Sequence, residues 1–407
     1  MSLCILFIFK NVTEAQITKN ISLQEAIQLA LETNPDILQA KQEINVARGR
    51  ILQSGRIPNP EVGFTFNEIL PNNKIGSANE KDISISQSFE YPTKRSSRVS
   101  VASFDEQLAI ITVEQMKVRV SVNVKKSYIN TQYLHAIVRS TQMQIELFQD
   151  FQKIVSNKYK TGESKYLDVL RIEVEIAHLQ NELVEAENNY FVSQTELKNI
   201  IGDSRGTLYA PEDSLTYTST NYNKDSLFAV LIQQSNTLQL AGMRIDKQKI
   251  NLSLAQTSYY PDFGVGLAYQ QRTPSNSFLG VEFKIAVPLW FWQEPRGQTE
   301  EATAQLTIAE LQRLTIERKI RNNLSAAFIN VEATEKQIWN YNQILRKGLS
   351  DILNVALTQY RNNQLDILNF FDIYRTYRTT QTDYVRAVAN YRRALAELEV
   401  AAEIQLN

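Results

Sequence analysis

The stretch "YKTGESKYLDVL", Tyr159 to Leu170, interrupts a sequence that otherwise has the composition of one continuous helix. The 69 residues of 93–161 contain neither Gly nor Pro, and nor do the 39 residues of 163–201. Gly is a common helix terminator, and at 1.5 Å per residue an unbroken helix over the first range would extend for about 100 Å. We therefore predict two long helices, 93–161 and 163–201, that fold back on each other at Gly162.

A second stretch, "YRNNQLDILNFF" (Tyr360 to Phe371), lies in a similar setting 201 residues later. The same offset aligns many other residues, among them Pro60 with Pro261, Gly63 with Gly264, Arg95 with Arg296, Leu167 with Leu368, Ala186 with Ala387, Tyr190 with Tyr391 and Leu197 with Leu398. One constant offset over about 140 residues indicates an internal duplication. We predict a first repeat over 16–201, an equatorial linker over 202–226 and a second repeat over 227–407.

Each repeat has the same order of elements. It begins with an amphipathic helix, which the capping box of Ser22 and Glu25 opens in the first repeat and which Asn34-Pro35 divides. Two strands follow, because apolar residues alternate there with small or polar ones. The expected strands cover about 60–68 and 82–91 in the first repeat and about 262–270 and 278–288 in the second. The hairpin of the second repeat is expected to comprise helices over 298–359 and 364–401.

The hairpin helices carry apolar residues at coiled-coil spacing. One seam of the first repeat runs through Val120, Val124, Ser127, Thr131, Leu134, Val138, Thr141, Ile145 and Phe148, and its partner through Ile172, Ile176, Leu179, Leu183, Ala186, Tyr190, Ser193 and Leu197. A second seam lies on another face of helix 163–201, at Leu170, Val174, Ala177, Val184 and Phe191. Two seams predict neighbours on both sides, as in the wall of a helical tube. An ordinary antiparallel bundle is the alternative that spacing alone leaves open.

Composition excludes several classes of protein. The 43 Lys and Arg residues balance 44 Asp and Glu residues, which gives no electrostatic basis for binding nucleic acid. The mean hydropathy of −0.30 excludes an α-helical membrane protein. The single cysteine, Cys4, excludes a disulfide framework and a cysteine-based metal site.

The short apolar run "SLCILFIF" (Ser2 to Phe9) resembles a secretory signal. We expect a signal peptide over residues 1–15 with cleavage before Gln16, although the basic residues that normally precede the apolar run are missing. A start codon assigned a few residues late would explain their absence, and a buried N-terminal strand is the alternative.

The strands predict contact with a membrane. Four amphipathic strands cannot close a barrel, and an open sheet would expose its edges and apolar face. Strands of 8 to 10 residues can cross a bilayer when tilted, so we expect several chains to combine their strands in one barrel with a wet lumen. Aromatic residues near strand ends (Tyr91, Tyr269, Phe278 and the "WFW" of Trp290 to Trp292) suit the interfacial belt, with core packing as the alternative for each.

These features together resemble the TolC family of outer-membrane efflux proteins, and the resemblance covers nearly the whole mature chain. It rests on the leader, the two homologous halves of strand pair plus long hairpin, and Tyr-x-x-Gly followed by Leu-Asp-Val-Leu at the turn. The phrase "GRIPNPEVGFTFNE" (Gly55 to Glu68) is most similar to the heavy-metal, CzcC-like branch. The fold expected is mainly α with a small membrane β part, built from tandem duplicated units with coiled-coil hairpins.

The resemblance implies a homotrimer with a twelve-stranded β-barrel in the cell outer membrane and a periplasmic α-barrel tunnel. It also implies a periplasmic membrane-fusion adaptor and an inner-membrane pump, usually of the resistance-nodulation-division type. Some members are lipid-anchored, but Cys4 follows Met-Ser-Leu rather than a lipobox.

In the family the hairpin turns form a periplasmic tip that polar links and acidic rings close. By position, the resemblance assigns to this tip Tyr159, Gly162, Lys165, Asp168, Tyr360, Asp366, Asn369 and Asp372. Tyr360 matches the tip tyrosine, and Asp372 the inner acidic ring. This sequence departs from the family at Leu365, where an arginine is common, at Asn369, where a second acidic ring would lie, and at Asn363, where a glycine would be expected. Asp366, Lys165 and Arg361 are candidate substitutes. Three Asp372 carboxylates near one axis would attract cations, whereas a solvated helix face is the alternative.

No enzyme motif competes with this interpretation. The chain has no G-x-G-x-x-G, P-loop or G-x-S-x-G sequence, and His135 and His178 are too few and too far apart for a metal centre. We therefore expect no cofactor and no metal site. The function expected is a passive exit duct for heavy-metal cations or drugs, with the substrate chosen by the pump. A type I secretion duct and a soluble periplasmic coiled-coil scaffold are the alternatives.

Overall fold

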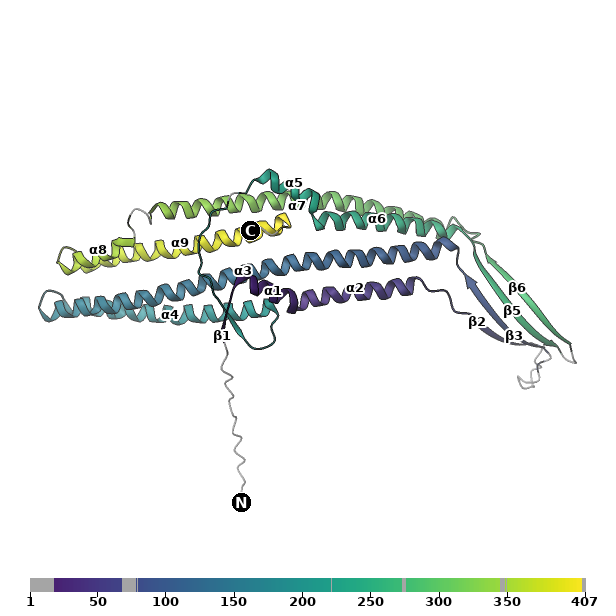
Figure 1. Ribbon diagram of the computed structural model, residues 1–407, viewed down its shortest axis with the longest axis horizontal. Coiled ribbons are helices and arrows are strands. Elements are labelled where there is room, and N and C mark those ends of the chain that lie inside the picture. The colour runs from purple at the N-terminus through teal and green to yellow at the C-terminus, as the bar shows by residue number, and fades with distance from the viewer. Residues whose placement is uncertain are drawn as a thin grey trace, which may run out of the picture. The chain divides into compact units, whose positions relative to one another are not determined.

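The computed structural model in Figure 1 describes residues 18–67, 78, 80–220, 222–272, 276–344, 348 and 350–404. The expected leader, residues 1–15, lies outside this part of the chain. Long helices make up most of the described residues and six strands the remainder of the regular structure. The predicted fold class, mainly α with a small β part, is confirmed.

The chain packs as two compact units that do not coincide with the sequence repeats. The helical unit takes Met1–Leu38, Met116–Gln233 and Arg321–Asn407, as far as these ranges are described. The sheet unit takes Gln39–Gln115 and Gln234–Ile320. Each unit is therefore assembled from corresponding parts of both repeats.

The helical unit begins with a short parallel sheet of β1 (Thr18–Ile21) and β4 (Leu208–Pro211). Helix α1 (Leu23–Thr33) starts with the predicted capping box of Ser22 and Glu25, and Asn34 separates it from α2 (Pro35–Ser54). Asn34 fixes this corner, since its Nδ2 donates to the Ile200 carbonyl over 2.7 Å. Helix α5 (Lys224–Gln234) follows the linker.

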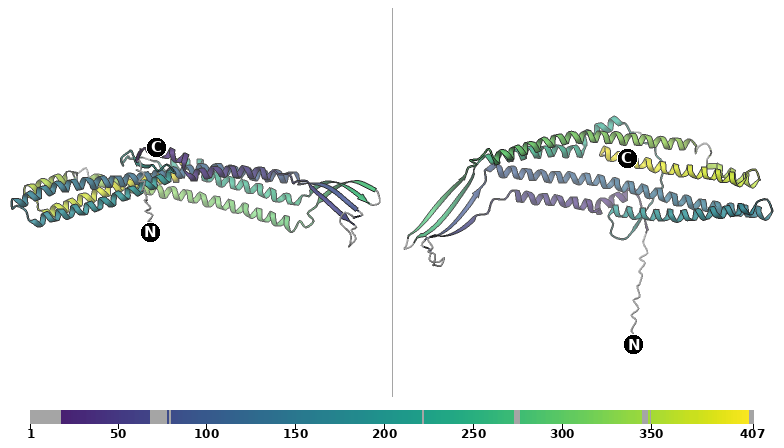
Figure 2. Two further views of the ribbon diagram at one scale, coloured as in Figure 1. Left: turned by 90° about the horizontal axis from the view of Figure 1, so that it is seen from below. Right: turned by 180° about the vertical axis from the view of Figure 1, so that it is seen from behind.

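Two helical hairpins form the rest of the helical unit. The first joins α3 (Pro92–Lys160) to α4 (Tyr166–Ile201), and the second joins α8 (Ser350–Arg361) to α9 (Ile367–Ala402) (Figures 1 and 2). The single helix expected over 298–359 is wrong: α7 (Glu294–Ile344) ends before Gly348, whose φ of 104° is outside the helical range.

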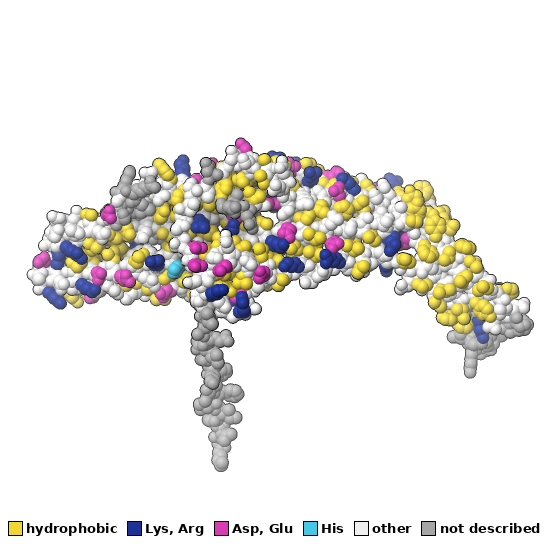
Figure 3. All heavy atoms as spheres, viewed as in Figure 1, with side chains coloured by type: hydrophobic (Ala, Val, Ile, Leu, Met, Phe, Trp, Pro, Cys, Tyr) yellow, Lys and Arg dark blue, Asp and Glu magenta, His cyan; other side chains and the backbone are white. Residues whose placement is uncertain are grey.

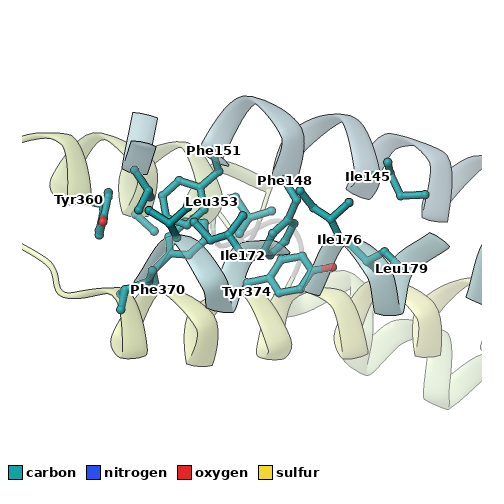
Figure 4. Packing of buried hydrophobic residues seen from close by; sticks show 14 residues of the cluster. Ile145, Phe148, Phe151, Ile172, Ile176, Leu179, Leu353, Tyr360, Phe370 and Tyr374 are labelled. Atoms are coloured by element: carbon teal, nitrogen blue, oxygen red, sulfur yellow. The ribbon is translucent and has the colours of Figure 1, made fainter. Parts of the chain in front are cut away.

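The first predicted seam is the core of the hairpins. Its residues from Val120 to Phe148 are buried or partly buried, and Phe148 is fully buried. Near the turns both hairpins contribute to one hydrophobic cluster, in which Phe148, Phe151, Ile172, Leu353, Phe370 and Tyr374 point toward one another (Figure 4).

The sheet unit contains an antiparallel sheet of four strands in the order β2-β3-β5-β6. The strands are β2 (Glu61–Asn67), β3 (Glu80–Phe89), β5 (Asp262–Arg272) and β6 (Asn276–Ala286). Strand β3 begins and ends two residues earlier than expected, because Glu80 and Lys81 pair with Arg272 and Gln271 on β5. Helix α6 (Asn236–Gln256), a short 3₁₀ turn (Thr257–Tyr259), most of α2 and the first parts of α3 and α7 complete the unit.

Candidate functional site

The two hairpin turns have the same backbone geometry at an offset of 201 residues. In the first, the Glu163 amide donates to the Lys158 carbonyl over 2.8 Å and the Gly162 amide to the Tyr159 carbonyl over 3.0 Å. In the second, Gln364 donates to Gln359 over 2.8 Å and Asn363 to Tyr360 over 3.2 Å. This pair of bonds is the Schellman motif, which needs a left-handed residue after the helix. Gly162 (φ 81°) and Asn363 (φ 57°) fill that position, so the missing glycine is replaced by the residue type that tolerates it next best.

This geometry predicts opposite effects of adding a methyl group at two glycines. Gly162→Ala forces a Cβ into the left-handed region at a cost of about 1–2 kcal/mol, so hydrogen exchange of the Glu163 amide should become about five to thirty times faster. Gly49→Ala is the matched control: Gly49 lies inside α2 with nothing within 4 Å of an added Cβ, and Ala there should stabilise the helix slightly. Equal effects at both sites would contradict the assigned turn.

The helices that leave the two turns use an aspartate at different cap positions. Asp168 lies in the first turn of α4 and accepts from the Lys165 amide over 3.2 Å and from Ser164 Oγ over 3.0 Å. Asp366 is itself the N-cap of α9, and accepts from the Asn369 amide over 2.8 Å and from Asn369 Nδ2 over 3.0 Å. Each carboxylate therefore satisfies free backbone donors and opposes the positive end of a helix dipole. The missing acid at Asn369 is matched by the additional acid at Asp366.

Lys158 joins the two turns to each other. Its Nζ donates to the Tyr360 carbonyl over 2.8 Å, donates to Asn363 Oδ1, and lies 5.1 Å from the centre of the Tyr360 ring. Asn363 Nδ2 in turn donates to Glu163 Oε2 over 3.3 Å. We call these three residues, Lys158, Asn363 and Glu163, the clasp. Since the Tyr360 carbonyl is near the end of α8, the clasp caps one helix with a lysine from another.

The two tip tyrosines, which the offset of 201 aligns, have opposite environments. Tyr360 is buried at 6% exposure, with its ring 4.9 Å from that of Phe151. Burial raises the pKa of the Tyr360 hydroxyl, and the Asp168 carboxylate raises it further while a hydrogen bond with Ser164 lowers it. Tyr159 is exposed and packs only beside Tyr166, at 5.6 Å between ring centres, among its ring contacts in the described chain. The second hairpin is thus anchored by its tyrosine and the first is not.

A cleft of about 640 Å³ lies between the turns. It brings together five predicted or substitute site positions, Lys165, Asp168, Tyr360, Leu365 and Asp366, with Lys158 and Arg171. Leu365 is partly buried against the hydrophobic cluster, which explains why an arginine is not needed there for packing. Tyr159, Gly162, Asn369 and Asp372 do not line the cleft.

Asp372 is exposed on the surface of α9. Its side chain is 73% exposed, and the nearest basic group among the described residues is that of Arg375, 3.9 Å away and equally exposed. In the single chain Asp372 therefore has the environment of a solvated carboxylate.

Sequence reasoning missed Lys158, Glu163 and Phe370 as functional candidates. Phe370 could have been found from its place in the apolar pattern of α9, but Lys158 and Glu163 carry no periodic signal. Among the described residues, no three His, Cys, Asp or Glu side chains are placed to hold a metal ion.

The sheet has one apolar face that is exposed to solvent. Across the four strands Val62, Ile85, Leu267 and Val281 form one row, and Phe64, Ile83, Tyr269 and Leu279 form the next. The large apolar side chains of this face are 41% to 77% exposed, and Figure 3 shows hydrophobic side chains gathered over the strands.

The opposite face of the sheet is polar or small. Its rows include Glu61, Ser86, Gly266 and Glu282 in register, and then Gly63, Ser84, Ala268 and Gly280. A Cβ at Gly63 would lie 2.8 Å from Ser84 Oγ, so side chains crowd this face. The outer strands of the described sheet are β2 and β6, each paired on one side only.

A second exposed apolar face lies on α4. The second predicted seam contains Val174 (56% exposed), Val184 (67%) and Phe191 (45%), whereas the first seam of the same helix is buried at Ile172 and Leu179. Within the described chain, no helix has an apolar stretch long enough to cross a lipid bilayer.

Comparison with known proteins places these surfaces in a family. Residues 26–203 match the model of a family described as outer membrane efflux protein. The cobalt-zinc-cadmium resistance protein CzcC of Cupriavidus metallidurans is 20% identical over 379 residues, which cover 93% of this chain and 89% of CzcC.

Solved outer-membrane proteins share the fold. A CusC structure superposes with a TM-score of 0.78 at 14% identity, over 95% of this chain and 93% of CusC. The outer membrane protein VceC of Vibrio cholerae superposes with a TM-score of 0.74 at 16% identity, over 95% of this chain and 97% of VceC.

Proposed function

The chain belongs to the outer membrane efflux protein family, and we propose that it is the passive exit duct of a tripartite efflux system. It is a transport protein rather than an enzyme. The proposed assembly is a homotrimer that joins its strands in one outer-membrane barrel and extends its hairpins into the periplasm. The internal duplication, which the equal turn geometry supports, would give each copy two hairpins and two strand pairs.

The observation that carries this proposal is the open sheet with an exposed apolar face. Four strands are too few to close a barrel, and an exposed apolar sheet with two unpaired outer strands would aggregate in water. Three copies joined between β2 and β6 would close a twelve-stranded barrel, with the apolar rows toward lipid and the polar rows toward the lumen.

The second seam of α4 supports the same assembly. Val174, Val184 and Phe191 are exposed at coiled-coil spacing on a helix whose other seam is already filled. A helix from a neighbouring copy would cover them, which turns the hairpins of three chains into a tube wall.

We assign the periplasmic tip to the two turns and the clasp, with Tyr159, Gly162, Lys165, Asp168, Tyr360, Asp366, Asn369 and Asp372 at or beside them. The partners proposed are a periplasmic membrane-fusion adaptor and an inner-membrane pump of the resistance-nodulation-division type. The substrate class proposed is heavy-metal cations, because the relative CzcC is named for cobalt, zinc and cadmium resistance. Drugs are the alternative substrate class.

Asp372 gives a test of the tip assignment. Three exposed carboxylates near the axis of a trimer would attract cations, so Asp372→Asn should reduce cation block and cation preference in single-channel recordings. Asp383→Asn, further along α9 and paired with Arg386 at 3.2 Å, is the matched control and should leave both unchanged. Identical recordings from the two variants would remove Asp372 from the conduction path.

The assembly itself is tested by migration on gels. Detergent-extracted protein from the outer membrane should run as a trimer without boiling and as a monomer after boiling. A chain that stays monomeric in that fraction, or that is found only as a soluble periplasmic protein, would rule out the duct and favour a scaffold.

A further inference from the structure

The chain enters α7 from β6 through a turn of exposed apolar residues, which we call the aromatic turn: Leu289, Trp290, Phe291 and Trp292. Their side chains are 64%, 63%, 54% and 53% exposed. The turn has a defined backbone, since the Gln293 amide donates to the Trp290 carbonyl over 3.0 Å and the Arg296 amide to the Phe291 carbonyl over 3.2 Å. The rings of Phe291 and Trp292 also lie edge to face at 5.2 Å. A fixed turn thus holds three large rings in solvent.

The equivalent junction of the first repeat, from β3 into α3, is closed within the chain. The offset of 201 aligns Trp290, Phe291 and Trp292 with Phe89, Glu90 and Tyr91. Glu90 makes two hydrogen bonds with Arg98, of 2.7 and 2.8 Å. The Tyr91 ring stacks on Tyr260 at 4.5 Å. The same position of the fold is therefore polar and satisfied in one repeat and apolar and exposed in the other.

The aromatic turn lies where the surface of the second repeat changes character along the chain. Before it, Phe283, Ile285 and Val287 continue the exposed apolar face of β6. After it, α7 opens with Glu294, and Arg296 pairs with Glu300 over 2.7 Å. Tryptophan favours such a boundary in membrane proteins, because its ring is apolar while its N–H still needs a polar partner.

We propose that the aromatic turn binds the headgroup region of the lipid bilayer, and that each copy is anchored there through this junction and not through the junction at Tyr91. The proposal rests on the proposed function, because it needs the sheet to lie in a membrane. It differs from an aromatic belt at every strand end. Tyr91 is stacked on Tyr260, and Tyr269 lies within the apolar rows with its hydroxyl donating to Ser277 Oγ over 3.0 Å. Phe278 is in register with Gln270, on the opposite face from those rows.

The three native tryptophans make the proposal measurable. They are Trp290 and Trp292 in the aromatic turn and Trp339 on the part of α7 that belongs to the helical unit. The full chain is placed in bilayers whose lipids carry bromine either near the headgroup end or near the methyl end of the acyl chain, and tryptophan fluorescence is recorded. Trp339→Phe reports on the aromatic turn alone, and the double variant Trp290→Phe/Trp292→Phe reports on Trp339 alone.

We expect the aromatic-turn signal to fall at least several-fold more than the Trp339 signal, and more with bromine near the headgroup than near the methyl end. In a background without native tryptophan, Phe283→Trp reports whether the apolar rows are in lipid, and Tyr91→Trp reports on the first junction. Phe283→Trp should be quenched and Tyr91→Trp should not.

The outcomes separate the two proposals. Quenching of Phe283→Trp without quenching of Trp290 and Trp292 would overturn the anchor and leave the duct intact, as would a bromine-insensitive aromatic turn covered by a second copy. Equal quenching of Tyr91→Trp and the aromatic turn would overturn the asymmetry. No quenching of Phe283→Trp would remove the membrane sheet itself, and with it the anchor.

Discussion

Replacing Val281 by Arg is expected to abolish trimer assembly in the outer membrane, while Glu282→Arg, one residue further along β6, is expected to be tolerated. The two positions receive the same side chain on the same strand, and both are well exposed in the single chain. They differ in face: Val281 is in the apolar row with Leu267, and Glu282 is in the polar row with Gly266.

The expected size of the effect follows from the lipid. An Arg that faces the middle of a bilayer costs about 2–4 kcal/mol in a barrel. A trimer carries the substitution three times, so the total is about 6–12 kcal/mol, which matches the net stability of a typical folded protein, about 5–15 kcal/mol. On the lumen side the guanidinium stays in water, and this cost does not arise.

The measurement is the amount of heat-modifiable trimer in the outer-membrane fraction. Val281→Arg should reduce it more than tenfold, whereas Glu282→Arg should stay within about twofold of the unmodified chain. If both variants assembled equally well, the apolar rows would not face lipid.

The second large effect is expected in the cluster between the hairpins. Phe370 is fully buried, and its ring lies 4.1 Å from that of Phe151 and 6.4 Å from those of Phe148 and Tyr360. Phe370→Ala removes contacts with rings from both hairpins and leaves a cavity, at a cost of about 3–5 kcal/mol. Because 1.4 kcal/mol is a factor of ten, hydrogen exchange in α8 should become roughly two to three orders of magnitude faster.

Leu368→Ala is the matched control, two residues away on the same helix and 56% exposed. A surface truncation of this kind changes stability by about 0.5 kcal/mol or less, so exchange in α8 should change by less than about threefold. Similar exchange in the two variants would mean that the aromatic cluster does not hold the hairpins together.

The long elements could be predicted from sequence because single residue types decide them. Gly162 ends a helix, alternation marks strands, and the offset of 201 carries each assignment from one repeat to the other. Gly348 was harder to interpret: an isolated glycine costs a helix only about 1 kcal/mol, so sequence alone does not say whether the helix continues. Strand β3 began earlier than expected because its start depends on pairing with Arg272, a residue 192 positions from Glu80.

The tip could be located from sequence but its contacts could not. The capping role of Asp366 follows a local rule, since an aspartate three residues before Asn369 can accept from that amide. Lys158 follows no such rule, because its long side chain reaches partners more than 200 residues away. Tyr159 and Tyr360 are identical in type and in register, and only tertiary packing buries one and leaves the other exposed.

The clasp has a consequence for the order in which the chain folds. The first turn closes through neighbours alone, because its backbone bonds and the Asp168 cap join residues close in sequence. The end of α8 also takes a donor from Lys158, made 202 residues earlier. The N-terminal hairpin therefore serves as the template on which the C-terminal hairpin is completed, in the direction of synthesis. A chain cut between the repeats would retain its first turn and lose part of its second.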